Sequence, residues 1–453
     1  MIEGKEHIIF LGIGGIGMSA LARYLNDSTD AHIQGYDKTP SPLTDELRRE
    51  GISVTFTDSF TSLKKNAQVD ASNTLVIYTP AIPDDLKLFA HFEAHGFDCV
   101  KRSKALGMIT KGTTNISVAG THGKTTTSSM LAHLLRVAGT EHVALLGGIS
   151  SELNSNYFNN SQGSDKIISV TEADEYDRSF LQLHPAFAAI TSIDPDHLDI
   201  YGDGEQLKES FVDFAQQVDT LFVHHSLTDQ FGSVAYKGAY GIDHGDYYAQ
   251  NVRVENASYH FDLQTPTGSI KDIRLGIPGR HNVENAVAAS ALYLESGGKP
   301  EYIHNALANF RGVKRRFEYI LREPIVHIDD YAHHPSELSA TIGSVRELYK
   351  DRTITGIFQP HLYSRTKDFY LGFAESLSLL DEIILLDIYP AREKPIPGVT
   401  SRMIAKEIPG KDVKVLAKDE LLPYLSSLRP EVLLTLGAGD IDRFVEPIKA
   451  LFE

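Results

Sequence analysis

The chain has 453 residues, which is too long for one ordinary hydrophobic core, so we expect two or three domains. No apolar run approaches the roughly 18 residues that a membrane span requires, which predicts a soluble protein without a membrane partner. The net charge of −17 argues against a nucleic-acid surface and favours small anions held by local cations. The single cysteine, Cys99, excludes an intramolecular disulfide, and acidic residues near the N-terminus argue against a signal peptide; both fit the cytoplasm.

The first stretch is typical of a dinucleotide-binding βαβ unit. An apolar run at 7–12 leads into a glycine-rich turn and a helical pattern, and a second strand ends at Asp37. The turn has the G-x-G-x-x-G spacing of a diphosphate-binding loop, and Asp37 lies where such domains place a ribose-binding acid. Taken alone, this stretch favours an NAD-dependent oxidoreductase. The glycines of the turn are Gly12, Gly14, Gly15 and Gly17.

A phosphate loop follows the first unit, whose end we place at residue 111. The strand-like run at 115–119 is followed by GTHGKTTT and a helical pattern. Glycines let successive N–H groups and the positive end of the helix dipole face one anion, while a lysine adds charge and a threonine hydroxyl suits magnesium. The sequence therefore predicts a nucleoside triphosphate site. Its residues are Gly120, Thr121, Gly123, Lys124, Thr125 and Thr126.

Two acidic clusters end later strand-like runs of this middle unit. The first run ends at Glu172, Asp174 and Glu175. The second run ends at the segment 194–199, which includes His197. Ligands of an open parallel sheet bind outside the carboxyl ends of its strands, so we expect both clusters beside the phosphate loop. Carboxylates suit magnesium, and an imidazole can be an additional ligand. For any single acid, a solvated loop or helix-capping role remains the alternative.

The remainder of the middle unit contains fewer candidate site residues. Short alternating runs at 218–275 predict an antiparallel addition to the sheet. Before the helical pattern at 283–296, Asn282 is a natural helix N-cap; the alternative places His281, Asn282 and Asn285 at the edge of an adenine.

The third unit alternates five strand-like runs with helical patterns and predicts another doubly wound α/β domain. Polar motifs again follow the strands, which predicts one functional rim. The motifs are DDYAHHP at 329–335, QPHLYSR at 359–365, YPAREK at 389–394 and GAGD at 437–440.

The combined motifs resemble the Mur ligase family along essentially the whole chain. They are GIGGIGMSALA, GTHGKTTT, EADEYD, DPDHLD, GRHNVENA, RRFE, DDYAHHP, QPHLYSR and GAGDI. The resemblance implies a Rossmann-like UDP-sugar domain at 1–111, a central ATPase domain at 112–317 with a parallel sheet and a small antiparallel addition, and a Rossmann-like amino-acid domain at 318–453. It also implies that the glycine-rich turn holds a UDP diphosphate and not NAD.

The resemblance also implies the reaction and its residues. ATP phosphorylates the carboxylate of UDP-N-acetylmuramate, and the amine of L-alanine then displaces phosphate. Lys124 and two Mg²⁺ ions would neutralise the developing charge, with Thr125 and Glu172 near the first ion and His197 near the second. Further family positions are matched by Asn282 and Asn285 on the adenine side, Arg316 and Asp330 toward the nucleotide, and His333 and Arg365 at the amino acid. Leu362 stands where the family usually has an arginine.

Three alternatives stay open at this point. A related ligase of the family recycles murein tripeptide onto the same UDP-sugar. The NAD-dependent oxidoreductase would leave the phosphate loop and acidic clusters without a role. A regulatory protein without turnover is disfavoured by the presence of Lys124, Glu172 and His197.

Overall fold

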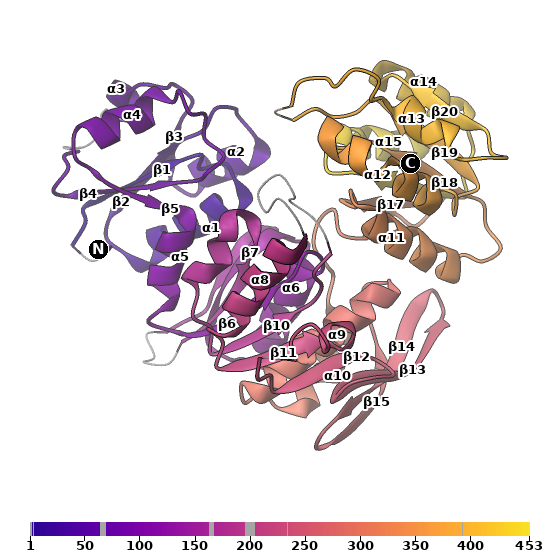
Figure 1. Cartoon of the computed structure of the whole chain (residues 1–453), viewed down its shortest axis with the longest axis horizontal. Coiled ribbons are helices and arrows are strands. Elements are labelled where there is room, and N and C mark those ends of the chain that lie inside the picture. The colour runs from indigo at the N-terminus through magenta and orange to yellow at the C-terminus, as the bar shows by residue number, and fades with distance from the viewer. Residues whose placement is uncertain are drawn as a thin grey trace. The chain divides into compact units, whose positions relative to one another are not determined.

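The computed structural model describes residues 2, 4–63, 69–162, 167–194, 204–232, 234–391 and 393–453. The chain forms two compact units. The first comprises Met1–Tyr248, Gln264–Gly268 and Asn285–Ala306, and the second comprises Ala249–Leu263, Ser269–Glu284 and Leu307–Glu453. Three β-sheets follow one another along the chain (Figure 1). None of the helices in the described residues is long and apolar enough to cross a membrane.

The first sheet is parallel and has the strand order β3-β2-β1-β4-β5 among the described residues. The chain winds outward in both directions from the central β1, as in doubly wound nucleotide-binding folds. The strands are β1 (His7–Leu11), β2 (His32–Tyr36), β3 (Ser53–Thr55), β4 (Thr74–Tyr78) and β5 (Asp98–Lys101). The helices are α1 (Ile16–Ser28), α2 (Pro42–Arg49), α3 (Phe60–Leu63), α4 (Lys87–Ala94) and α5 (Arg102–Thr110).

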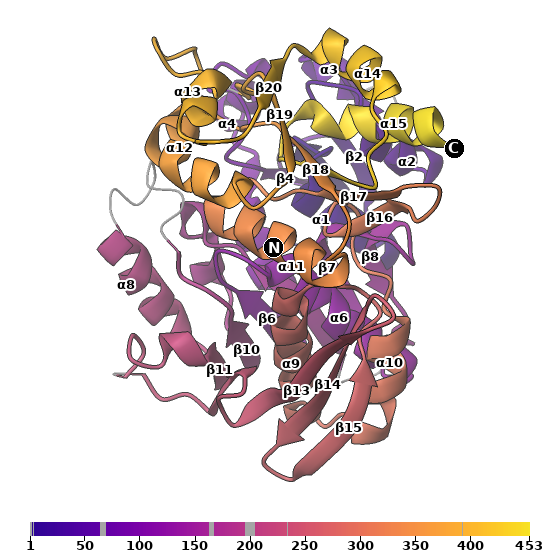
Figure 2. The same cartoon turned by 90° about the vertical axis from the view of Figure 1, so that its right-hand side faces the viewer.

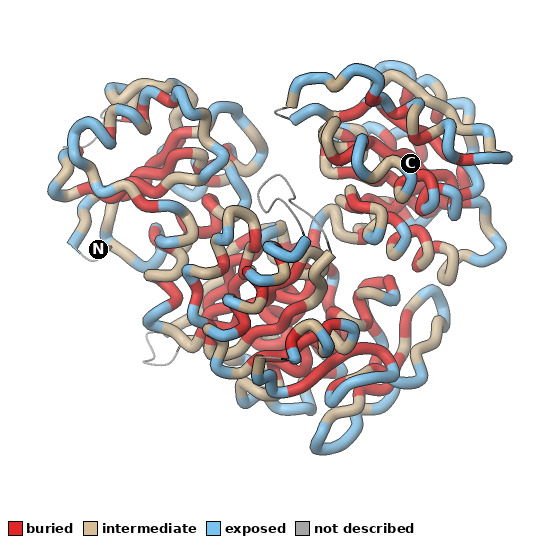
Figure 3. The backbone as a smooth tube through the Cα atoms, viewed as in Figure 1, coloured by how far each residue is buried: buried red, intermediate tan, exposed pale blue. Residues whose placement is uncertain are grey.

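Both faces of this sheet are buried. Ile8 and Phe10 pack in one hydrophobic cluster with residues of α1, whereas Ile9 and Leu11 pack in another with residues of α4. Successive strand residues point to opposite faces, so a strand covered on both sides has a continuous apolar sequence. Figure 3 shows the same pattern in each sheet, with buried central strands and largely exposed loops. The predicted first strand is confirmed.

The second sheet has the order β15-β14-β13-β12-β11-β10-β6-β9-β7-β8 in the described part of the chain. Its strands are β6 (Thr114–Ala119), β7 (His142–Ser150), β8 (Ser155–Asn159), β9 (Ile168–Ala173), β10 (Phe187–Ile190), β11 (Thr220–His224), β12 (Gly238–Ile242), β13 (Tyr247–Glu255), β14 (Ser258–Thr265) and β15 (Gly268–Arg274). The helical segments are α6 (Lys124–Val137), η2 (Tyr176–Gln182), α8 (Gly204–Ala215), η3 (His225–Leu227), α9 (Arg280–Glu295), η4 (Pro300–Tyr302) and α10 (Ile303–Asn309).

The phosphate-loop strand β6 lies between β9 and β10 and pairs in parallel with both. The expected antiparallel addition is wrong for its first run, because β11 pairs in parallel with β10 and with β12. The runs after it form hairpins instead. Asn256 and Ala257, with φ of 50° and 53°, are the two left-handed residues between β13 and β14, as in the turns that join adjacent antiparallel strands. Figure 2 shows β13, β14 and β15 side by side.

The third sheet has the order β16-β17-β21-β18-β19-β20 over the residues described there. It is parallel except for β16, which pairs antiparallel with β17, and all five predicted strands are present. The strands are β16 (Glu318–Leu321), β17 (Val326–Asp330), β18 (Ile354–Phe358), β19 (Glu382–Leu386), β20 (Val413–Leu416) and β21 (Val432–Leu436). The helical segments are α11 (Pro335–Leu348), α12 (Tyr363–Leu377), α13 (Ser401–Lys406), α14 (Lys418–Ser427), η5 (Asp440–Phe444) and α15 (Val445–Phe452).

Within the first unit, polar contacts fasten α1 to the edge strand β8. The buried Asn156 on β8 donates to the Ile16 carbonyl at 2.6 Å and to the Ser19 hydroxyl at 2.9 Å, and it accepts from Arg23. Arg23 also forms an ion pair with Glu50 at 2.7 Å. Buried polar groups with satisfied hydrogen bonds fix one arrangement. The glycine-rich turn at the start of α1 is thereby held in place relative to the second sheet.

Candidate active site

The phosphate loop has the predicted strand, loop and helix. Gly120 and Gly123 have φ of 132° and 82°, a left-handed conformation that glycine adopts without strain. A Cβ at Gly120 would overlap the Thr191 hydroxyl at the end of β10. The chain then enters α6, whose first N–H groups have no partner within the helix. This geometry presents N–H groups and the positive end of the α6 dipole to an anion.

Ser192, beyond β10, braces the loop. Its carbonyl accepts from the Thr121 N–H at 3.0 Å, and its hydroxyl accepts from the His122 N–H at 2.9 Å. The Thr121 hydroxyl in turn accepts from the Asp194 N–H at 3.0 Å. The acidic segment that begins at Asp194 is expected beside the loop, whereas Ser192 belongs to no predicted site motif, because serine after a strand is a common loop residue.

Lys124 is held by two oxygens. Its ammonium donates to the Gly120 carbonyl at 2.5 Å and to the Glu175 carboxylate at 2.7 Å. Glu175 is 1% exposed. Burial disfavours the charged lysine, but Glu175 and Asp174 outweigh it and raise the pKa of Lys124 above its ordinary value. Lys124 is therefore a charged, oriented cation at the loop, and its partner Glu175 is a site residue whose separate role within the acidic cluster no sequence motif indicates.

Glu172 reaches the same loop from the end of β9. It accepts from the Thr125 hydroxyl at 3.0 Å and, through its other oxygen, from the Gly147 N–H at 2.6 Å. A Cβ at Gly147 would lie 2.7 Å from the carboxylate carbon of Glu172. The carboxylate therefore fits at this position on β7 because glycine has no side chain. Burial raises the pKa of Glu172, although Gly147 and Lys124 oppose the shift. Sequence reasoning missed Gly147, which lies far from every motif.

The pair of Thr125 and Glu172 fits a magnesium ion. Mg²⁺ is commonly held by one or two carboxylates together with water and substrate phosphates. The described residues contain no group of three or more histidine, cysteine or acidic side chains able to hold a metal by themselves. The predicted ligand His197 lies outside the described residues.

The two predicted adenine-side asparagines differ in their surroundings. Asn285 accepts from the Thr127 hydroxyl on α6 at 3.1 Å and lies against Gly123, where a Cβ would be 2.7 Å from its oxygen. It thus lies beside the phosphate loop. Asn282 is not the predicted N-cap, because α9 begins at Arg280 after Gly279, with φ of 113°. Its amide donates to the Pro278 carbonyl at 2.6 Å.

The glycine-rich turn joins β1 to α1. Gly12 has φ of 84°, and Gly15 immediately precedes the helix. The Gly14 N–H donates to Asp37 at 2.8 Å, so the predicted ribose-binding acid is in contact with the turn. Gly17 lies inside α1, where a Cβ would overlap the guanidinium of Arg102. Arg102 is a further cation at the start of this helix that no sequence motif indicated.

In the second unit, His333 and Arg365 both lie beside His361. The rings of His333 and His361 are 6.3 Å apart edge to face, and an Arg365 guanidinium nitrogen is 3.5 Å from the His361 Nδ1. His361 also stacks on Tyr389, with ring centroids 5.7 Å apart. Three of the predicted rim motifs therefore meet here. His361 lies in the same motif as Arg365, but the motif alone does not indicate a role for it.

Arg316 and Asp330 lie near the same rim. Asp330 accepts from the Phe317 N–H at 2.9 Å and the Ala332 N–H at 2.8 Å. Burial raises its pKa to about 6, although Arg316 opposes the shift. The Arg316 guanidinium lies 5.0 Å from the centroid of the Tyr331 ring. Asp330 thus braces the turn after β17 that carries Tyr331.

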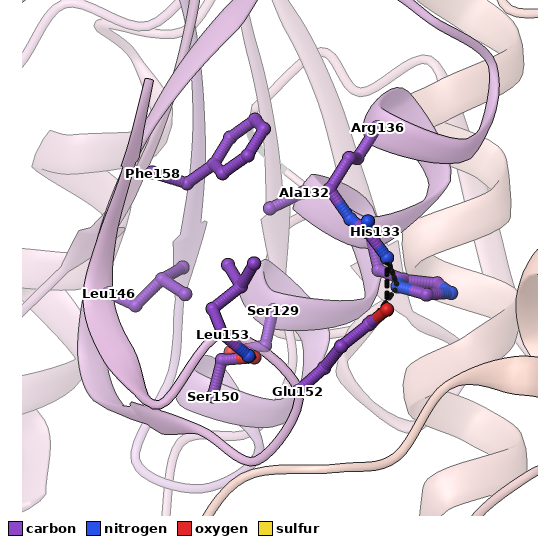
Figure 4. Close-up of a pocket in the computed structure, with 9 residues that line it drawn as sticks. All are labelled: Ser129, Ala132, His133, Arg136, Leu146, Ser150, Glu152, Leu153 and Phe158. Atoms are coloured by element: carbon purple, nitrogen blue, oxygen red, sulfur yellow. Dashed lines mark hydrogen bonds and ion pairs between the residues drawn. The ribbon is translucent and has the colours of Figure 1, made fainter. Parts of the chain in front are cut away.

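A small cavity lies on another part of α6, away from the loop residues (Figure 4). Glu152 bonds both polar neighbours there, His133 at 3.0 Å and Arg136 at 2.5 Å. Burial lowers the pKa of His133. None of the predicted site residues lines the cavity, whose walls are Ser129, Ala132, His133, Arg136, Leu146, Ser150, Glu152, Leu153 and Phe158.

These features define an α/β protein with the geometry of a phosphate loop in one sheet and clusters of polar side chains at strand ends of the two other sheets. Known protein families match the three sheets in turn. The Mur ligase family catalytic domain matches residues 7–114, the Mur ligase middle domain matches 118–293, and the Mur ligase glutamate ligase domain matches 315–439. The chain belongs to the Mur ligase family.

Individual relatives match over nearly their whole length. The chain is 48% identical to the UDP-N-acetylmuramate–L-alanine ligase of Flavobacterium psychrophilum, over 98% of this chain and 97% of that one. It is also 48% identical to the enzyme of that name from Phocaeicola vulgatus, over 99% of both chains. The crystal structure of UDP-N-acetylmuramate–alanine ligase from Thermotoga maritima matches with a TM-score of 0.81 at 29% identity, covering 98% of this chain and 99% of that one. The predicted fold class is confirmed.

Proposed function

We propose that the chain uses ATP to join L-alanine to the carboxylate of UDP-N-acetylmuramate, giving ADP and phosphate in peptidoglycan precursor synthesis. The relatives named for this reaction, at 48% identity over 98% of the chain, carry the assignment. The buried ion pair of Lys124 with Glu175 beside the phosphate loop supports an active nucleotide site. We place the reaction in the cytoplasm.

The proposed chemistry follows from the charges that the reaction creates. A carboxylate is a poor acyl donor, so transfer of the ATP γ-phosphoryl group first makes it an acyl phosphate, which the alanine amine attacks with loss of phosphate. Lys124 and the N–H groups at the start of α6 would stabilise the transferring phosphoryl group. Thr125 and Glu172 would hold one Mg²⁺ ion, and His197 would hold a second. The metal would neutralise phosphate charge when bound.

The three ligands are assigned to three parts of the chain. We propose domain limits of 1–111 for the UDP-sugar, 112–317 for ATP and 318–453 for alanine. The turn from Gly12 to Gly17 would hold the UDP diphosphate. Asn282, Asn285, Arg316 and Asp330 would serve the nucleotide.

We propose that His333 and Arg365 bind alanine. An arginine can bond both oxygens of a carboxylate, and Arg365 is held by its neighbour His361. Leu362 is the residue before α12 and has φ of 70°, a strained conformation for a residue other than glycine; it lies in the same motif as Arg365.

Phosphate release from ATP tests the assignment. The purified chain is supplied with Mg²⁺ and UDP-N-acetylmuramate together with L-alanine, with murein tripeptide, or with neither amine. We expect release with alanine and little without an amine. Faster release with tripeptide would assign the chain to murein recycling instead. Phosphate release at the same rate with alanine, with tripeptide and without an amine would refute ligation.

A further inference from the structure

Arg102 occupies a position shared between two ligand loops of the first unit. Its guanidinium lies against Gly17 at the start of α1, where even a methyl group would overlap it. The same guanidinium forms an ion pair with Asp174 at 2.9 Å. Asp174 belongs to the segment after β9, which we call the acidic loop and define as residues 174–178. One side chain therefore contacts the proposed UDP-diphosphate turn and the loop beside the nucleotide site.

The acidic loop is held by cations on both sides. Its Glu175 pairs with the phosphate-loop Lys124 at 2.7 Å, and its Asp177 pairs with Lys101 at 2.7 Å. Asp177 and Arg178 have φ of 53° and 54°, so two consecutive residues other than glycine adopt the left-handed conformation. Such a conformation persists only where surrounding contacts impose it. The ion pairs of the loop supply those contacts.

We propose that Arg102 is a positioning residue that couples occupancy of the glycine-rich turn to nucleotide binding at Lys124. This inference rests on the proposed function, because it takes the ligand of the turn to be the diphosphate of a UDP-sugar. A diphosphate at the turn attracts the guanidinium and weakens its bond to Asp174. The strained acidic loop then loses one of its restraints. Glu175 holds Lys124 less firmly, and the lysine becomes available to the phosphates of ATP.

The coupling has a definite sign. Lys124 bonds Glu175 and the Gly120 carbonyl, so a nucleotide has to compete with these two oxygens for it. A ligand that loosens the acidic loop reduces that competition, and UDP-N-acetylmuramate should tighten nucleotide binding. By linkage, the nucleotide should tighten binding of the UDP-sugar by the same factor.

Isothermal titration calorimetry measures this factor directly. A non-hydrolysable ATP analogue with Mg²⁺ is titrated into the full chain with and without UDP-N-acetylmuramate. We expect the UDP-sugar to lower the Kd of the analogue about fivefold or more, the range of typical allosteric couplings. In Arg102→Gln the factor should fall to about one. This variant should also bind the UDP-sugar about tenfold more weakly, because a charged hydrogen bond is lost.

Two variants separate this role from a structural one. Lys101→Gln removes the neighbouring exposed ion pair of the same loop and should keep the coupling. Arg102→Lys keeps the charge and should retain part of it. The inference would be overturned if UDP-N-acetylmuramate left the Kd of the analogue unchanged in the unmutated chain, or if Arg102→Gln kept the full coupling factor. Either result would leave the proposed function intact. Failure of the unmutated chain to bind UDP-N-acetylmuramate would overturn both.

Discussion

The ion pair of Lys124 and Glu175 allows stability and catalysis to be separated by mutation. The two side chains are 15% and 2% exposed, and their charged atoms are 2.7 Å apart. Lys124→Met removes the ammonium and leaves a carboxylate buried without this partner. Breaking a buried ion pair by removing one member costs about 3–5 kcal/mol of unfolding free energy. We expect that loss in Lys124→Met.

The double variant Lys124→Met, Glu175→Gln should recover most of the loss. A neutral glutamine has a much smaller desolvation cost than a carboxylate, and neutral replacements of buried ion pairs are often tolerated. Both variants should ligate alanine at least about a hundredfold more slowly, since both lack the charge that faces the transferring phosphoryl group. Both should bind UDP-N-acetylmuramate nearly as the unmutated chain does, because that ligand is assigned to another sheet.

Urea unfolding followed by circular dichroism provides the measurement, since the chain has no tryptophan for fluorescence. Phosphate release and calorimetry with the UDP-sugar complete the comparison. Equal stability of Lys124→Met and the unmutated chain would refute the argument that Glu175 depends on Lys124. A double variant as unstable as the single one would do the same. Loss of UDP-sugar binding in both variants would contradict the assignment of the two anions to different loops.

Three further changes test other parts of the structure. Gly147→Ala should displace the Glu172 carboxylate and lower the ligation rate at least about tenfold, with a higher Mg²⁺ requirement in a titration of activity. Arg365→Ala should raise the Michaelis constant for alanine roughly ten- to a hundredfold and that for ATP much less, in steady-state assays, because a charged hydrogen bond is lost. Burial lowers the pKa of His327 from 6.5 to about 4, so the unfolded chain takes up the proton first as the pH falls. The neutral His327 contributes about 3 kcal/mol to the free energy of unfolding above pH 6.5, and this contribution is lost as the pH falls toward 4. In His327→Leu, the free energy of unfolding measured in urea should fall less between pH 6.5 and pH 4. An unchanged fall would exclude this histidine as its cause.

The features predicted best from the sequence were those in which local pattern and burial agree. The phosphate loop combines an apolar strand, two glycines and a helix start, and each part appears in the structure as expected. Short edge strands were missed, because three or four residues such as β3 and β16 carry too little pattern. The run at β11 has three consecutive apolar residues, as a buried parallel strand does, and its parallel pairing depends on β10 and β12, which lie outside the run.

The site could be predicted only as far as its motifs extended. Glu172 and Glu175 belong to one motif, and sequence spacing does not reveal that one faces Thr125 while the other binds Lys124. Gly147 and Arg102 belong to no site motif, because their roles arise from the approach of separate elements. Asn282 was assigned to a cap from its residue type, whereas the positive φ of Gly279 lets α9 begin earlier.

The paired cations would explain how a chain with a net charge of −17 binds the proposed anionic ligands. Lys124 and Arg102 are each held by a carboxylate of the acidic loop, so each is charged, oriented and partly removed from water by the protein itself. A phosphate that replaces such a carboxylate binds a cation that is already oriented, so little free energy is needed to reorganise the site. Such preorganisation is the condition for strong electrostatic stabilisation. The replaced carboxylates lie within one strained loop between the two sites. In the proposed coupling, exchange of partners at one site therefore changes the restraint on the other, and the same acids that keep the cations in place would connect the two anion sites.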